Sequence, residues 1–313
     1  MIRLSADHHF SIGREHVGSG KPCQDHALSM YEDGMACAVI SDGCSAGGET
    51  DMGARVLTFG SIAAIRAYYD RHDNINFSSD TGEHGVVTEV GVQQRIVLGT
   101  VRHALGLARD DMLATCGYAF ATREGGVIHL VGDGVIATKA RDGSVSIFRY
   151  DWGKVPFYPQ YREESGGAGY VREHGDPTTP ALFEEHWSYD PISKEFVCRG
   201  TVAHAVIDGM RGITQSISKE TLTDYIDVIA VFTDGVLRVD GVDWKDVVIA
   251  LLSFKTTKGV FVKRRMIRAL KDFCNQGKGP MDDIAYAVIH VEIEPIEQGD
   301  IHGNSNQDSQ SST

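Results

Sequence analysis

The chain has 313 residues, of which 42% are apolar, so it can bury a substantial core and does not have the composition of a disordered protein. Its formal net charge is −13, from 43 acidic against 30 basic residues, and no dense run of Lys and Arg indicates the basic face that binds a polyanion. Nucleic acid is therefore excluded as an expected partner.

The six cysteines form no CxxC pair, so their spacing fits neither a zinc site nor a disulfide framework. The N-terminal residues contain no apolar stretch that resembles a signal peptide, and no run reaches the roughly 18 apolar residues that span a bilayer. We expect a reduced, cytoplasmic protein that does not associate with membranes.

The first half of the chain opens with an apolar run over residues 35–40, which predicts a strand covered on both faces. A glycine-rich loop over 43–48 leads to a predicted helix over about 51–69. Residues 70–91 are polar and contain glycine, so they predict a loop, and a second helix is expected over 92–113.

The rest of the chain changes period. Short strands separated by glycine-containing turns predict an antiparallel meander over 118–122, 127–131, 135–139 and 145–150. An irregular stretch with several prolines, expected to cover the sheet edge or form a flap, occupies residues 151–200. The remaining predictions are strands at 228–232 and 284–293, helices at 244–253 and 260–273, and a polar, disordered tail over 295–313. This order predicts one α+β domain over residues 1–294.

Aspartates recur at the ends of the strands predicted to be buried. They are Asp42 after residues ACAVIS, Asp133 after VIHLVG, Asp234 after VIAVFT, Asp282 and Asp283 before IAYAVIHV, and Asp25 in the pair Gln24-Asp25. A carboxylate beside a packed core is costly unless it is paired or bound to a metal, and no Lys or Arg is adjacent in sequence to most of these positions. Converging carboxylates would repel one another, and Mg²⁺ or Mn²⁺, which prefer oxygen ligands, would relieve that repulsion.

The alternative interpretation is that each Asp-Gly pair is only a hairpin turn. Asp133 is the most open to it, because a strand restarts directly after Gly134. Asp42 and Asp234 fit it less well, since each is followed by a loop or a helix. The complete ordered set favours a shared site.

These motifs resemble those of the PP2C, or PPM, phosphatases. The order QD, SDG, VGDG, TDG and DD over about residues 10–293 is similar to the family's acidic pair, DGxGG, GDS, SDG and DN, and the piece GKPCQDH resembles a bacterial branch. The resemblance implies a four-layer α-β-β-α sandwich, in which two antiparallel sheets are flanked by helices. It also implies a metal-dependent hydrolase that removes phosphate from phosphoserine and phosphothreonine proteins through a metal-activated water.

Carried over by position, the family's site residues imply two Mg²⁺ or Mn²⁺ ions at one end of the sandwich. The ligands would be Asp25, Asp42, Asp234, Asp282 and the backbone carbonyl of Gly43, with Asp42 bridging the ions and Asp25 and Asp42 central to catalysis. Asp133 matches the GDS aspartate, which in the family can hold a third, weaker metal. The implied partners are a phosphorylated protein substrate and a cognate kinase.

The sequence departs from the family at several positions. Cys44 stands where the family usually has a histidine that is a candidate general acid, and Gly20 replaces the arginine that grips the phosphate. The DN pair is Asp282-Asp283, and Arg238 replaces an additional aspartate. We hypothesise that the missing cation comes from Lys21, Arg14 or Arg238.

Two other functions compete with this one. The residues Gly43 to Gly47 match GxSxG, the nucleophile elbow of α/β-hydrolases, which would make Ser45 the nucleophile and a late histidine such as His290 its base. Cys44 as a covalent nucleophile is disfavoured, because a thiolate needs a nearby cation and the surrounding charges are negative. The second rival is a catalytically impaired relative that binds phosphoproteins or regulators.

Overall fold

The computed structural model describes residues 2–293 except 49, 73–74, 76, 78–79, 154, 165–166 and 177, and it describes the backbone but not the side chains of residues 80–82. The expected tail over 295–313 lies outside the described residues, so the boundary at 294 stays a prediction.

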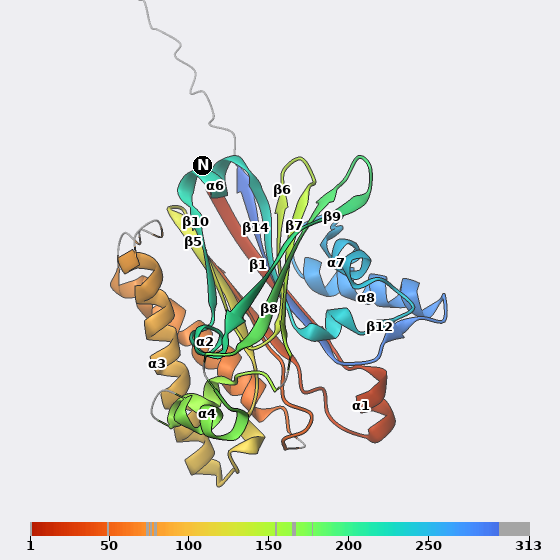
Figure 1. Cartoon of the computed structure of the whole chain (residues 1–313). Coiled ribbons are helices and arrows are strands. Elements are labelled where there is room, and N and C mark those ends of the chain that lie inside the picture. The colour runs from red at the N-terminus through yellow and green to blue at the C-terminus, as the bar shows by residue number, and fades with distance from the viewer. Residues whose placement is uncertain are drawn as a thin grey trace, which may run out of the picture.

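Two antiparallel sheets form the centre of the molecule (Figure 1). The larger has seven strands in the order β1 (Ile2–Ser11), β14 (Ile284–Ile293), β11 (Ile226–Phe232), β6 (Gly134–Ala140), β7 (Val145–Trp152), β8 (Pro180–Asp190) and β9 (Glu195–Ala205). The smaller has five, in the order β10 (Ile213–Ser218), β5 (Gly125–Val131), β4 (Cys116–Thr122), β3 (Met35–Ser41) and β2 (His26–Glu32). Strands β12 (Val239–Asp240) and β13 (Gly279–Pro280) pair to form a separate two-stranded sheet.

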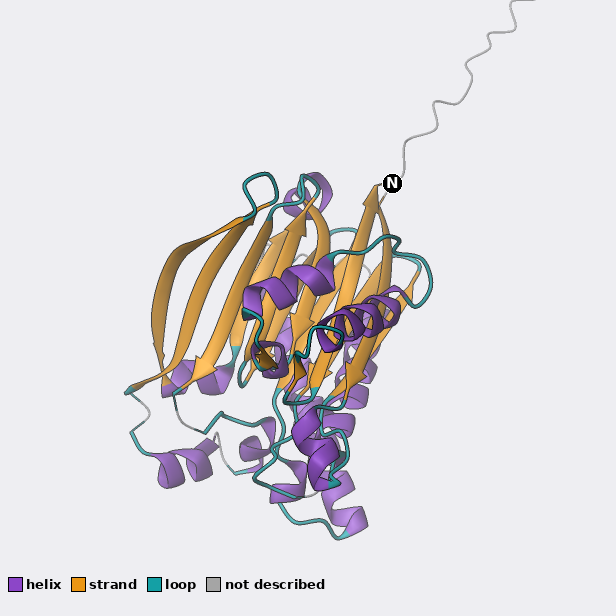
Figure 2. Ribbon diagram, turned by 90° about the vertical axis from the view of Figure 1, so that its right-hand side faces the viewer, coloured by secondary structure: helices purple, strands orange, loops and turns teal. Residues whose placement is uncertain are grey.

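Helices cover the outer face of each sheet (Figures 1 and 2). The pair α2 (Met52–Arg71) and α3 (Asp80–Leu105) packs on the five-stranded sheet, and the pair α7 (Trp244–Leu252) and α8 (Phe261–Cys274) packs on the seven-stranded sheet. Shorter helices are α1 (Arg14–Ser19), α4 (Ala168–His174), α5 (Val206–Arg211), α6 (Lys219–Asp224) and the 3₁₀ turns η1 (Asp110–Met112), η2 (Pro159–Glu163) and η4 (Asp234–Leu237). The predicted four-layer α-β-β-α sandwich is confirmed.

The layers explain why β3 reads as a continuous apolar run. Successive side chains of a strand point to opposite faces. Met35, Cys37 and Val39 pack toward α2 and α3, whereas Ala36, Ala38 and Ile40 pack into the core between the two sheets. Both faces are buried, so the strand needs apolar residues at every position.

Several sequence predictions are wrong in detail. The predicted meander is broken, because β5 and β6 belong to different sheets, and Gly132 to Gly134 carry the chain from one sheet to the other. The stretch over 151–200 is not irregular throughout, since it contains β8 and part of β9, which form a hairpin that widens the larger sheet. Helix α3 begins at Asp80 and ends at Leu105, earlier at both ends than the predicted helix over 92–113.

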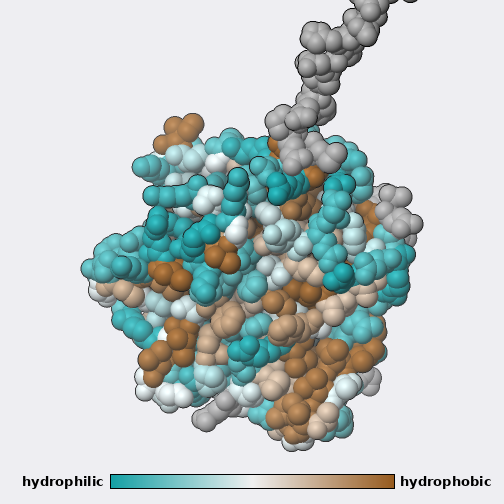
Figure 3. Space-filling model, turned by 180° about the vertical axis from the view of Figure 1, so that it is seen from behind, coloured by the Kyte–Doolittle hydropathy of each residue, from teal (hydrophilic) through white to brown (hydrophobic). Residues whose placement is uncertain are grey.

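The surface is mostly polar, with one larger apolar area visible from behind on the side of α2 and α3 (Figure 3). Exposed apolar side chains on these helices include Phe59, Val92, Ile96 and Leu105. Over the described residues, none of the helices combines the length and the apolar character that crossing a lipid bilayer requires.

Candidate metal centre

Strand pairing brings the predicted acidic residues to one end of the sandwich. His26 of β2 pairs with Ser41 of β3, so Asp25 and Asp42 leave the small sheet at the same edge. Phe232 of β11 pairs with Tyr286 of β14, which places the end of β11 and the start of β14 together in the large sheet. Asp234 comes shortly after β11 and Asp282 shortly before β14, so both lie at that edge.

Asp25, Asp42 and Asp234 form the centre of this group. The side chain of Asp42 hydrogen-bonds to those of both Asp25 and Asp234. Burial raises the pKa of all three carboxyls, and charge repulsion from neighbouring aspartates adds to the increase. These groups can lie together only if they share protons or if cations neutralise them.

Asp133 adds a fourth carboxyl at the crossing between the sheets. Burial raises its pKa to about 8, with the charge of Asp234 as the next cause. Its Oδ1 atom is buried and has no hydrogen-bond partner among the described residues. Gly132 and Gly134 flank it with φ of 103° and 145°, a backbone that favours glycine, so the crossing fixes the position of this aspartate.

Asp282 is the member that is already paired. Its Oδ2 atom accepts a hydrogen bond of 2.5 Å from Nη1 of Arg238, whose other nitrogen contacts Glu15 at 3.2 Å. The charge of Asp282 also raises the pKa of Asp234, after burial, so the two carboxyls are neighbours. We call Asp25, Asp42, Asp133, Asp234 and Asp282 the acidic cluster.

The donor atoms of the acidic cluster can be compared with the ligands that divalent ions require. Among the described residues, no three His, Cys, Asp or Glu side chains form a group that could hold a metal ion as they stand. The available donors are all oxygens, the type that Mg²⁺ and Mn²⁺ prefer. The unpartnered Oδ1 of Asp133 and the mutual repulsion of the carboxyls are the features that cations would satisfy. The residue types therefore fit hard divalent ions.

Asp283 has a supporting role that sequence reasoning missed. It is 2% exposed, and its carboxylate accepts hydrogen bonds from the backbone N–H of Gly13 (2.7 Å) and of Gln24 (2.6 Å). Its Oδ2 atom also lies 2.7 Å from Nδ1 of His16. These contacts tie the segment that carries Asp25 to the start of β14. In the sequence, the sign of this role was the second Asp of the pair Asp282-Asp283.

Thr233 supports the cluster from the neighbouring strand. Its hydroxyl donates to Oδ2 of Asp25 at 2.6 Å and accepts from the backbone N–H of Ala285 at 2.8 Å. The threonine therefore connects Asp25 in the small sheet to β11 and β14 in the large sheet. It directly precedes Asp234 in the TDG motif.

The three candidate phosphate-binding cations differ in their surroundings. Lys21 donates from Nζ to the carbonyl of Ser45 at 3.2 Å, so it reaches the loop that follows Asp42. Arg14 contacts the carbonyl of Gly279 at 3.3 Å and Asp240 at 3.6 Å. Arg238 is engaged by Asp282 and Glu15, as described above.

The segment after β7 reaches the same loop. Tyr158 is buried and its hydroxyl lies beside Cys44, and burial is the main cause that raises its pKa. The charges of Asp42 and Asp133 act in the same direction, so this hydroxyl faces the acidic cluster. Tyr158 lies in the stretch over 151–200 that was expected to cover the sheet edge or form a flap.

The α/β-hydrolase alternative is contradicted. Helix α2 begins at Met52, not directly after Ser45 as a nucleophile elbow requires, and both large sheets are antiparallel. His290 lies six residues along β14 from its start at the cluster edge, about 20 Å at the rise of a strand. It contacts Asp227 at 3.6 Å.

Comparisons with known proteins agree with the fold. The family model for protein phosphatase 2C matches residues 12–153. A solved bacterial serine phosphatase is 11% identical, covering 94% of this chain and 100% of its own at a TM-score of 0.53. The serine/threonine phosphatase Stp1 from Staphylococcus aureus is 12% identical, covering 93% and 96% at a TM-score of 0.50. At such identities the solved structures show a shared fold. No curated protein matches the chain.

Proposed function

We propose that the chain is a member of the protein phosphatase 2C family, whose model matches residues 12–153, and that it is a divalent-metal-dependent hydrolase that removes phosphate from phosphoserine and phosphothreonine in proteins. The observation that carries the proposal is the junction of Asp25, Asp42 and Asp234, three carboxyls from separate segments, at one end of the sandwich. A binding module has no use for such a concentration of like charge.

The proposed ligands are Asp25, Asp42, Asp234, Asp282 and the backbone carbonyl of Gly43. Asp42 is the bridging residue in this assignment, which its contacts with both Asp25 and Asp234 support. Asp133, with its unpartnered oxygen, is the proposed ligand of a third and weaker ion. When bound, two Mg²⁺ or Mn²⁺ ions would neutralise the substrate phosphate and make water a better nucleophile at neutral pH.

The protein residues have separate tasks in this proposal. Thr233 and Asp283 orient Asp25, Thr233 by a hydrogen bond to its carboxylate and Asp283 by a bond to the adjacent backbone. Lys21 is the best placed of the candidate phosphate cations, because Arg14 and Arg238 are in ion pairs with carboxylates. Arg238 must release Asp282 or share it when that carboxylate takes up a metal.

A second candidate function is a catalytically impaired relative that binds a phosphoprotein without hydrolysing it. The ion pair between Arg238 and Asp282 favours it, since a cation already neutralises one proposed ligand. Cys44 in the place of the family's histidine favours it as well.

Hydrolysis of a phosphoserine peptide separates the two candidates. Metal-free protein, prepared with a chelator, should release no phosphate, and added Mn²⁺ or Mg²⁺ should restore the release. An Arg238→Ala variant should need less metal for half-maximal activity, because Asp282 is then free. If no metal supports hydrolysis while the peptide still binds, the impaired relative is the correct description.

A further inference from the structure

A strongly basic segment lies in this acidic protein, away from the acidic cluster. Between residues 254 and 271 the sequence has seven Lys or Arg and no Asp or Glu, although the whole chain carries a net charge of −13. The expectation that the chain has no dense group of basic residues is therefore wrong for this segment. The segment comprises the loop after α7 and most of α8. The helical spacing of α8 and the loop after α7 bring several of these basic residues close to one another in space.

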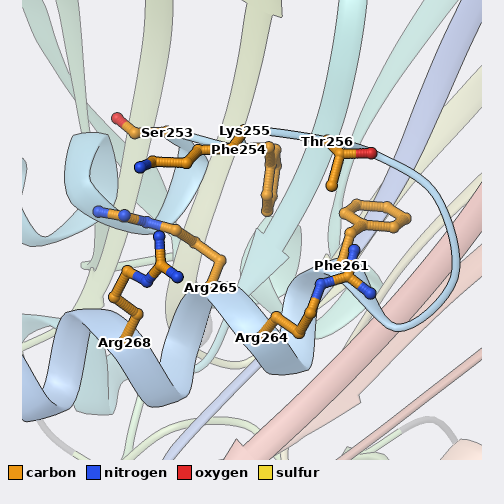
Figure 4. Close-up of a pocket in the computed structure, with 8 residues that line it drawn as sticks. All are labelled: Ser253, Phe254, Lys255, Thr256, Phe261, Arg264, Arg265 and Arg268. Atoms are coloured by element: carbon orange, nitrogen blue, oxygen red, sulfur yellow. The ribbon is translucent and has the colours of Figure 1, made fainter.

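Part of this segment lines a cavity of about 250 Å³ on the outer side of the seven-stranded sheet (Figure 4). Its lining residues are Ser253, Phe254, Lys255, Thr256, Phe261, Arg264, Arg265 and Arg268, which we call the basic pocket. Figure 4 shows the guanidinium groups of Arg265 and Arg268 turned toward the loop that carries Lys255.

The cations of the basic pocket have no carboxylate partner within ion-pair distance among the described residues. Arg264 donates to the carbonyl of Lys258 at 2.6 Å, and Arg265 donates to the carbonyl of Ala250. For Lys255 and Arg268, no hydrogen bond or ion pair is formed within the described part of the chain. Most arginines elsewhere behave differently, as in the pair of Arg109 with Glu173 at 3.0 Å.

The pocket has an apolar wall formed by two packed phenylalanine rings. Phe261 is 2% exposed and packs edge-on against Phe254, with ring centroids 5.1 Å apart. The first turn of α8 is fixed by Asp7 of β1, whose Oδ2 accepts the backbone N–H of Val262 at 2.6 Å. The N-terminus of the helix is thus already satisfied, and the free positive charge comes from the side chains.

Arg265 shows the effect of crowding these cations. It is half-buried, and burial lowers its pKa from the ordinary value, with the charge of Arg268 acting in the same direction. Asp272 acts in the opposite direction but forms no ion pair with it. An anion between Arg265 and Arg268 would remove a repulsion that the protein alone leaves in place.

We propose that the basic pocket binds the phosphoryl group of a phosphorylated protein segment, without hydrolysing it. Guanidinium groups form paired, charge-assisted hydrogen bonds with phosphate oxygens, and clusters of arginine are a recurring means of recognising phosphorylated segments. The cavity is small and concave, which suits one phosphorylated side chain. Membranes and nucleic acids present extended negative charge, which the other acidic surfaces of this chain repel.

The pocket residues belong to the loop after α7 and to α8, whereas the acidic cluster lies at the strand ends between the sheets. Binding here therefore does not depend on hydrolysis at the acidic cluster. A chain with no phosphatase activity could still bind a phosphorylated segment, and an active enzyme could lack this second site.

The test is fluorescence anisotropy of a labelled phosphoserine peptide and of its unphosphorylated form, measured with the full chain in the presence of a chelator. The pocket variant is Arg264→Gln with Arg268→Gln. The matched control is Lys263→Gln with Lys271→Gln, which removes the same charge from the same helix but not from the pocket lining. Hydrolysis of p-nitrophenyl phosphate by each variant reports separately on the acidic cluster.

The expected result is that phosphorylation strengthens peptide binding about tenfold or more, and that this gain is lost in the pocket variant and kept in the control. Equal weakening by both variants would mean long-range attraction only and would overturn the proposal, as would equal binding of the two peptides. Stronger, pocket-dependent binding of vesicles of equal parts phosphatidylserine and phosphatidylcholine, or of single-stranded DNA, would also overturn it in favour of a polyanion.

Discussion

The adjacent residues Asp282 and Asp283 should respond differently to the same substitution, because only Asp283 should contribute much to the free energy of unfolding. Asp283→Asn keeps the shape of the side chain but turns an acceptor of the Gln24 N–H into an amide donor, and it removes the charge facing His16. Hydrogen bonds to a buried charge are worth about 1.5–3 kcal/mol each, so losing these two should lower the free energy of unfolding by about 3 kcal/mol or more. The variant should also bind Mn²⁺ about tenfold more weakly, because the segment before Asp25 loses its anchor.

Asp282→Asn is the matched control. The side chain of Asp282 is 19% exposed and its partner Arg238 is 49% exposed, so this ion pair should contribute less than about 1 kcal/mol to the free energy of unfolding. Its loss should nevertheless weaken metal binding, since Asp282 is a proposed ligand. Urea denaturation and calorimetric Mn²⁺ titration of both variants make the comparison. An Asp282→Asn variant as unstable as Asp283→Asn, or an Asp283→Asn variant within about 0.5 kcal/mol of the wild type, would refute the division of roles.

Three further changes test other parts of the molecule. Burial lowers the pKa of His129 to about 3, so the proton that the unfolded chain takes up near pH 6.5 should contribute about 2 kcal/mol to the stability lost between pH 7 and pH 5. Urea denaturation at the two pH values should show a loss smaller by about this amount in His129→Gln, and an equal loss in both proteins would contradict it. Thr233→Val should lower the free energy of unfolding by about 2 kcal/mol, whereas Thr233→Ser should be nearly neutral, because only the hydroxyl bonds Asp25 and Ala285. Cys44→His should raise turnover of phosphoserine peptides more than that of p-nitrophenyl phosphate, whose leaving group needs no proton; equal changes in kcat would exclude a leaving-group role at this position.

The sequence predicted the buried strands and the grouping of their terminal aspartates well, because a strand buried on both faces leaves a continuous apolar run. It did not predict the crossing at Asp133, since a Gly-Asp-Gly turn can either close a hairpin or pass the chain between sheets. Only the pairing of β5 with β4 and β10, and of β6 with β7 and β11, distinguishes the two. Strand β9 was missed for a different reason, because most of its residues are exposed and its hydrophobic pattern is weak.

Within the acidic cluster, residue type was predictable but pairing was not. The sequence gives no sign that Arg238 forms an ion pair with Asp282, 44 positions away, or that Tyr158 lies against Cys44. Asp283 was indistinguishable from Asp282 in the sequence, yet one is a buried anchor and the other contacts an exposed arginine. These differences depend on contacts between distant segments.

Metal binding and hydrolysis measured together on Asp42→Asn test the proposed centre most directly. The control is Asp142→Asn, which changes an exposed aspartate in the hairpin turn between β6 and β7. Calorimetric titration with Mn²⁺ should show that Asp42→Asn loses the tightest binding, and its metal-stimulated hydrolysis of phosphopeptide should fall about a hundredfold or more, while Asp142→Asn matches the wild type. Unchanged Mn²⁺ binding and hydrolysis in Asp42→Asn would mean that the acidic cluster is not the catalytic centre.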